Sequence, residues 1–183
     1  MNQWLTDFYY NWTRKVQSIV GQDLSHIYDK YITSFVIYNN LYNQIPDRLV
    51  ASGIAVPNKI FDSRAATDFV IQFIGADVIL TEIANNNLDK DISTIIELIE
   101  HEAFYIKINR DGRQRNEDLK ILADLKSNNP TRKAKGVLQV IYYVRCNIFH
   151  GHKDFQEYHR TLVEPLTRIL SVLNPLLYNR LTT

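Results

Sequence analysis

The sequence TRKAKGVLQVIYYVRCNIFHGHK, residues 131–153, decides the fold that we expect for this chain. Its apolar residues recur at the three- and four-residue spacing of a helix that buries a broad face. They are Val137, Leu138, Val140, Ile141, Val144 and Ile148. Gly151 is typical of the position that follows a helix C-terminus. We therefore predict a long buried helix over residues 131–150, with cations gathered at its C-terminal end.

Most of the remaining sequence also shows helical periodicity. Gly21 ends a first helix, Asp23 can cap the second, and the second ends at Ile45-Pro46, because the residue before a proline avoids the helical region. We expect a loop over residues 50–59 and either a short hairpin or a plain loop over residues 106–113. The further helices are predicted over residues 3–20, 23–45, 62–74, 76–84, 89–104, 117–125 and 154–178, with residues 62–84 forming one helix or two.

The composition agrees with a helical domain. The chain has 183 residues, 45% of them hydrophobic and 22% charged, which suits a single domain with a substantial core. Six Gly and five Pro are few for an all-β sandwich, which uses these residues in turns. We predict one all-α domain over residues 1–183, an antiparallel helical bundle with additional helices and loop insertions.

Charge and cysteine content exclude several classes of protein. The formal net charge of +1 excludes a basic nucleic-acid-binding arm, so any contact with nucleic acid requires a local patch. The lone Cys146 excludes an internal disulfide framework and is consistent with the cytoplasm. We find no secretory signal, no apolar run long enough to span a bilayer, and no metal-ligand spacing. We therefore expect no membrane association and no bound metal.

The end of the predicted helix 131–150 carries Arg145, His150, His152 and Lys153. One interpretation is structural, because cations near a helix C-terminus interact favourably with the helix dipole, by about 0.3–1 kcal/mol each. The other is chemical, because arginine binds phosphate oxygens and histidine transfers protons near neutral pH. The spacing of Arg145 and His150 alone does not separate these two interpretations.

The longer string from Tyr142 to Lys153, followed by a long final helix, resembles the HEPN superfamily, the nucleotide-binding domains of higher eukaryotes and prokaryotes. The family pattern is an arginine and a histidine separated by four to six residues near the end of a core helix, often followed by glycine and a basic residue. It is matched here by Arg145, His150, Gly151 and Lys153.

Two positions depart from the family pattern. Cys146 stands where family members often have a polar residue, and Asn147 follows one position later. His152 stands where one toxin branch has a tyrosine that a partner nucleotidyltransferase modifies, so that route of regulation is not expected here.

The resemblance implies metal-independent RNA cleavage at a homodimer interface, without a cofactor. In that reaction the RNA 2′-OH attacks the adjacent phosphate. His150 would transfer protons, Arg145 would stabilise the developing charge, and Asn147 would orient His150 or hold the 2′-OH. A toxin or an antiviral defence component of this kind would have RNA as its substrate and an antitoxin or regulatory protein as a partner.

Four further residues are candidates for binding RNA. His152 and Lys153 follow the motif, and Arg132 and Lys135 lie at the opposite end of the same helix. Arg132 and Lys135 form either a solvated helix start or a track for phosphates. Two other functions remain open for the whole chain, namely a non-catalytic module of the same fold that binds RNA, nucleotide or protein, and a scaffold domain.

Overall fold

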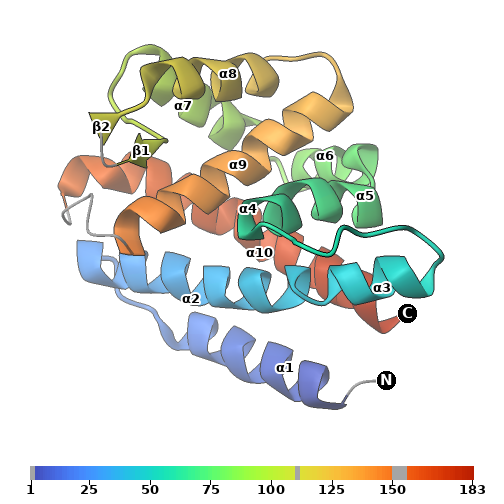
Figure 1. Cartoon of the computed structure of the whole chain (residues 1–183). Coiled ribbons are helices and arrows are strands. Elements are labelled where there is room, and N and C mark those ends of the chain that lie inside the picture. The colour runs from blue at the N-terminus through green and yellow to red at the C-terminus, as the bar shows by residue number, and fades with distance from the viewer. Residues whose placement is uncertain (1–2, 110–111, 150–155) are drawn as a thin grey trace.

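The computed structural model describes residues 3–109, 112–149 and 156–183, and over these ranges the chain is almost entirely helical (Figure 1). The prediction of an all-α fold is therefore confirmed. One two-residue antiparallel hairpin, β1 with β2, is the only sheet among the described residues. The elements are α1 Gln3–Ser18, α2 Leu24–Tyr42, α3 Ile45–Ala51, α4 Asp62–Arg64, η1 Ala65–Phe69, α5 Val70–Ile74, α6 Ala76–Asn85, α7 Asp89–Glu100, β1 Ile108–Asn109, β2 Gly112–Arg113, α8 Arg115–Leu125, α9 Pro130–Phe149, η2 Glu157–His159 and α10 Arg160–Thr182.

Helix α9 is surrounded by other elements along its middle. Val137, Leu138, Val140, Ile141 and Val144 are all fully buried. α9 packs against α8 on one side and against η1, α5 and α6 on another. A helix with apolar residues on most of its surface must be covered in this way, because each fully buried aliphatic side chain contributes roughly 1.5–3 kcal/mol.

Helix α2 forms the second part of the core, between α1 and α9 as Figure 1 shows, and it packs most extensively on α10. The Asp23 side chain caps its first turn by accepting a hydrogen bond from the backbone N–H of His26, at 3.1 Å. Tyr31 and Tyr38 are fully buried, and their hydroxyls donate to the backbone carbonyls of Ile141 in α9 (2.7 Å) and Ala66 in η1 (2.5 Å). The tyrosines thus bury apolar rings while satisfying their hydroxyls, as buried tyrosines usually do.

An ion pair fixes α10 against α7. Arg168 donates two hydrogen bonds to the buried carboxylate of Asp91, from Nε to Oδ2 at 3.0 Å and from Nη2 to Oδ1 at 2.6 Å. This fork-to-fork geometry is the strongest form of an arginine–carboxylate contact. α10 continues through Pro165 and Pro175 and packs on α2, α6 and α7.

Pro46 was interpreted wrongly from the sequence. α2 ends at Tyr42, and a separate helix, α3, begins at Ile45 with Pro46 in its first turn. Proline is favoured there because the N–H groups of a first helical turn have no intrahelical acceptor in any case. The loop expected over residues 50–59 accordingly begins after Ala51.

The segment 62–85 forms two helical units. Gly75, with a φ of 97°, separates them, because such a conformation is strained for residues with a Cβ. The first unit contains a π-helical turn, η1, between α4 and α5. The hairpin alternative for residues 106–113 is correct, with Ile108 opposite Arg113 and Asn109 opposite Gly112.

The close approach of α8 and α9 at Gly136 gives a stability prediction. A Cβ at Gly136 would lie 2.9 Å from the backbone nitrogen of Leu125. Alanine gains about 1 kcal/mol of helix propensity, but overpacking costs typically ~1–3 kcal/mol. We expect Gly136→Ala to lower the free energy of unfolding by about 1 kcal/mol, measured by urea denaturation. Thr131→Ala, at an exposed position of α9, is the control. If Gly136→Ala instead stabilised the protein, α8 and α9 would be able to move apart at no cost in free energy.

Candidate functional site

The arginine of the motif lies between α9 and α2. Arg145 is half-buried, and its guanidinium carbon lies 5.0 Å from the centre of the Phe35 ring, which is buried on α2. A cation over an aromatic face is attracted by about 0.5–2 kcal/mol, depending on its solvation. Its Nη1 also lies 3.9 Å from Sγ of the neighbouring Cys146. These contacts restrain Arg145 at the edge of the core, in the last two turns of α9.

A carboxylate that receives two phenols lies beside this arginine. Tyr42 of α2 donates to Oδ1 of Asp62 at 2.7 Å, and Tyr142 of α9 donates to Oδ2 of Asp62 at 3.1 Å. Tyr42 also contacts Oδ1 of Asn39. Burial raises the pKa of Tyr42 well above its usual value, the Asp62 hydrogen bond raises it further, and the positive charge of Arg145 acts in the opposite direction. Asp62 therefore connects three helices, a role that its position at a helix start did not indicate.

The side chain of Asn147 makes a buried structural hydrogen bond and does not face solvent. Its side chain is only 2% exposed, and its Nδ2 donates to the carbonyl oxygen of Ile106 at 2.8 Å. Asp118 binds the same segment, accepting from the backbone N–H groups of Ile106 (3.1 Å) and Lys107 (2.8 Å). Asn147 thus ties the end of α9 to the segment that precedes β1 of the hairpin.

The two basic residues predicted at the start of α9 are paired with carboxylates. Nε of Arg132 lies 2.7 Å from Oδ1 of Asp124, and Nζ of Lys135 lies 2.7 Å from Oδ1 of Asp68. With 1.5 Å of helix rise per residue, Arg132 lies about 20 Å and Lys135 about 15 Å along α9 from Arg145. The structure therefore does not bring either residue next to Arg145.

Three predicted site residues, His150, His152 and Lys153, lie outside the described residues. Of the predicted catalytic set, the structure therefore places Arg145 and Asn147. Within the described ranges, no group of three or more His, Cys, Asp or Glu side chains could hold a metal ion. No helix of the described part of the chain is long and apolar enough to cross a bilayer.

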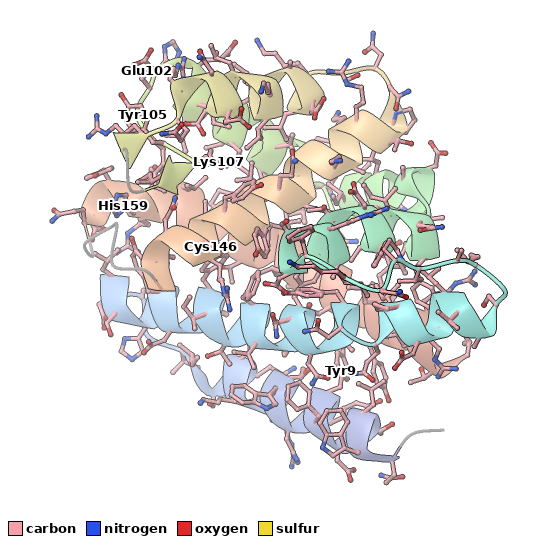
Figure 2. The ribbon with its side chains drawn as sticks, in the orientation of Figure 1. Tyr9, Glu102, Tyr105, Lys107, Cys146 and His159 are labelled. Atoms are coloured by element: carbon pink, nitrogen blue, oxygen red, sulfur yellow. The ribbon has the colours of Figure 1, made fainter. Side chains whose placement is uncertain are left out.

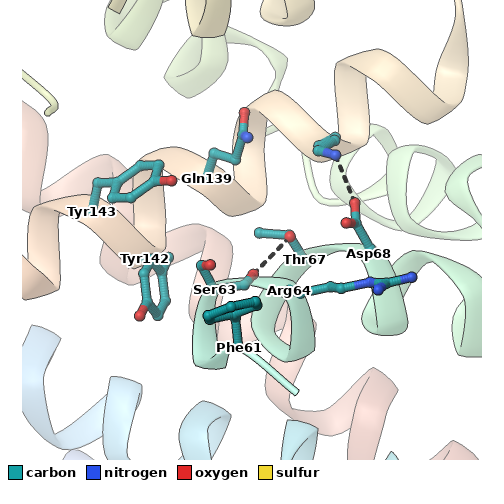
Figure 3. Close-up of a pocket in the computed structure, with 9 residues that line it drawn as sticks. Phe61, Ser63, Arg64, Thr67, Asp68, Gln139, Tyr142 and Tyr143 are labelled. Atoms are coloured by element: carbon teal, nitrogen blue, oxygen red, sulfur yellow. Dashed lines mark hydrogen bonds and ion pairs between the residues drawn. The ribbon is translucent and has the colours of Figure 1, made fainter. Parts of the chain in front are cut away.

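A pocket of about 210 Å³ opens next to Tyr142, between α9 and the segment 61–68 (Figure 3). This pocket is not among the sites predicted from the sequence. The sequence holds one local signal for it, the string Lys59-Ile60-Phe61-Asp62-Ser63-Arg64. In this string the large apolar side chain of Phe61 stands between the cations Lys59 and Arg64, just before the predicted helix begins. The pocket is lined by Phe61, Ser63, Arg64, Thr67, Asp68, Lys135, Gln139, Tyr142 and Tyr143.

The buried phenols give a prediction for alkaline pH. Burial raises the pKa of Tyr31, Tyr38 and Tyr42, whereas a tyrosine in the unfolded chain titrates near pH 10. Their contribution to stability is therefore fully present below about pH 10 and is lost above it, by about 1.4 kcal/mol per pH unit and per tyrosine. Urea unfolding at a series of alkaline pH values measures this slope. Tyr42→Phe should have a shallower slope than the wild-type protein, and an equal slope would contradict the assignment.

The Asn147 contact gives a second prediction. Asn147→Ala leaves the buried carbonyl of Ile106 without this donor, so we expect the free energy of unfolding to fall by about 1–3 kcal/mol. The same substitution at Asn116, which is exposed in α8, should change it by less than about 0.5 kcal/mol. Urea denaturation of both variants tests this, and equal effects at the two sites would mean that the Ile106 contact does not stabilise the fold.

Comparisons with protein-family models, with curated proteins and with solved structures gave no match to this chain.

Proposed function

We propose that this chain is a metal-independent endoribonuclease of the HEPN type that acts on RNA as a homodimer, as a toxin or antiviral defence effector in the cytoplasm. The observation that carries the proposal is the placement of Arg145. Its guanidinium is held over the Phe35 ring at the end of a rigid, buried helix, five residues before His150 in the sequence. A cation–π contact restrains the arginine side chain at this position.

The proposed reaction uses the RNA as its own nucleophile. The 2′-oxygen attacks the adjacent phosphorus while a general base removes its proton. The bond from phosphorus to the 5′-oxygen then breaks, and a general acid protonates that oxygen. The products are a 2′,3′-cyclic phosphate and a 5′-hydroxyl. Histidine suits both proton transfers because its pKa lies near neutrality, which leads us to assign them to His150. The planar, permanently charged guanidinium of Arg145 suits the pentacovalent phosphate.

Two copies of the chain would supply a complete site. One copy of the motif contributes a single arginine and a single histidine, whereas base and acid catalysis in one turnover use two proton-transferring groups. Two motifs facing each other across a two-fold axis provide both. In this proposal Asn147 positions the end of α9 through Ile106, and it does not contact RNA.

A second candidate is a non-catalytic RNA-binding module of the same fold, which would meet an antitoxin or another regulatory protein as partner. Two observations favour it. The amide of Asn147 is engaged with the backbone, and Cys146 occupies the position next to Arg145 where a polar group is usual in the family. Such a module would bind RNA with affinity that falls as salt rises, without cutting it.

Cleavage of a labelled single-stranded RNA separates the two candidates. We expect the wild-type protein to cut the RNA in the presence of EDTA and to leave a 2′,3′-cyclic phosphate. His150→Ala and Arg145→Gln should each lower the rate by about 100- to 10,000-fold, the usual contribution of a positioned proton donor or charge. RNA with a 2′-deoxyribose at the cut site should remain intact.

Arg14→Gln is the matched control, because Arg14 is exposed on α1 and contacts only Asn11 of its own helix among the described residues. It should cleave at the wild-type rate. Circular dichroism and sedimentation of each variant show whether fold and dimer persist. Full activity in folded His150→Ala, or inhibition by EDTA, would overturn the proposal, and binding without cleavage by the wild-type protein would favour the second candidate.

A further inference from the structure

The pocket beside Tyr142 has two chemically different walls. Segment 61–68 supplies hydroxyl groups and the guanidinium of Arg64, and α9 supplies the ammonium of Lys135, the amide of Gln139 and two phenol rings (Figure 3). Thr67 donates its hydroxyl proton to the Ser63 carbonyl at 2.7 Å, so its oxygen still presents lone pairs. The walls thus offer donors, acceptors and rings within a small space.

An aromatic ring stands at the mouth of this pocket. Phe61 is 62% exposed, and exposure of such a ring forfeits the hydrophobic stabilisation that burial gives. Nζ of Lys59 lies 5.4 Å from its centre. Across the pocket, Nζ of Lys107 lies 5.1 Å from the centre of the Tyr143 ring. Tyr143 is half-buried and Lys107 also pairs with Glu117, so the exposed ring of this pair of contacts is Phe61. An exposed ring beside a cation is the arrangement with which proteins stack unpaired bases and track the attached phosphates.

The charge around the pocket favours an anion. Arg64 places its guanidinium carbon 5.3 Å from the Phe69 ring centre, and no carboxylate of the described residues lies within ion-pairing distance of it. Lys135 pairs with Asp68, with side chains 37% and 40% exposed. A pair so exposed contributes only about 0–1 kcal/mol, so a phosphate can compete with Asp68 for the lysine.

The size of the pocket limits what it can hold. Its volume of about 210 Å³ lies below the roughly 300–1,000 Å³ of pockets that enclose drug-sized ligands. One base with its phosphate fits this limit better than a complete dinucleotide cofactor. Thr67 and Asp68 lie on the π-helical turn η1, and single π-helical turns are frequent at functional sites.

The pocket and Arg145 lie along the same side of α9. Tyr142 lines the pocket, precedes Arg145 by three residues, and therefore lies about 60° from it around α9. Lys135, at the far end of the pocket, lies about 15 Å along the helix from Arg145. A chain that enters at Lys135 and follows α9 reaches Arg145 within a few nucleotides.

We propose that this pocket binds one unpaired nucleotide of single-stranded RNA, with its base stacked on Phe61 and its phosphate held by Arg64 and Lys135. The inference names the substrate class and a specificity site for the RNA cleavage proposed above, and it rests on RNA being the ligand. It predicts a requirement for an unpaired residue within a few nucleotides of the cut, because a base within a duplex cannot stack on a protein ring.

Fluorescence anisotropy with a labelled single-stranded oligouridylate tests the pocket. All proteins carry His150→Ala, so that the probe stays intact. Phe61→Ala should weaken binding between about 5- and 160-fold, the range for loss of one base stack. Arg64→Gln should weaken it and reduce the slope of log affinity against log salt by about 0.7, as expected for one lost phosphate contact on a single strand.

Trp4→Ala and Arg14→Gln are the matched controls on α1, where Trp4 is also an exposed aromatic residue. Both should bind RNA as the parent does. Unchanged affinity in Phe61→Ala and Arg64→Gln would overturn the pocket assignment. It would also be overturned if double-stranded RNA bound as well as the single strand.

These outcomes are distinguishable from failure of the proposed nuclease. If the wild-type protein binds RNA through Phe61 and Arg64 but never cuts it, the pocket assignment stands and the catalytic proposal fails. If the wild-type protein cuts RNA and both pocket variants cut at the same rate under subsaturating substrate, the pocket assignment fails and the catalytic proposal stands.

Discussion

Close packing around α9 determines the positions at which this helix can carry polar side chains. Its fully buried residues meet neighbours on most sides, and α8 approaches so closely that Gly136 leaves no room for a Cβ in front of Leu125. Side chains that need water or a partner are therefore confined to the two helix ends and to one narrow stripe. The stripe, with Lys135, Gln139 and Tyr142, is the wall of the pocket in Figure 3, and the C-terminal end holds Arg145.

The tyrosines of α2 show how this core accommodates buried hydroxyl groups. Buried phenols are tolerated because each hydroxyl has an acceptor, and three of these acceptors lie on other elements: Ile141 on α9, Ala66 on η1 and Asp62 on α4. Figure 2 shows that α2 lies between α1 on one side and α4, η1 and α9 on the other. The same residues that fill the core therefore hold α2, η1 and α9 in register beside the pocket. A conventional aliphatic core would exclude water equally well but would not fix these backbones through directional bonds.

Local chemistry explains which parts of the fold could be predicted. The cap at Asp23, the break at Gly75 and the apolar face of α9 are each determined by residues within one or two helical turns. The π-helical turn η1, by contrast, packs against both α2 and α9. The contacts of Asn147 with Ile106 and of Tyr142 with Asp62 join residues 41 and 80 positions apart. No spacing rule within a helix indicates such pairs, so the cluster of Asp62 and the pocket required the tertiary structure.

The helical geometry of α9 also limits which motif residues can act together. Arg145 and Asn147 are two residues apart, so they project about 200° apart around the helix. Arg145 accordingly meets Phe35 on α2, and Asn147 meets Ile106 in the segment that precedes β1. A ligand bound on one side of α9 therefore cannot contact both side chains. Tyr142 lies on the same side as Arg145, and it connects that arginine to the aromatic and basic stripe. The side of α9 that carries Arg145 therefore continues through Tyr142 toward Lys135, whereas Asn147 holds the helix end from the opposite side.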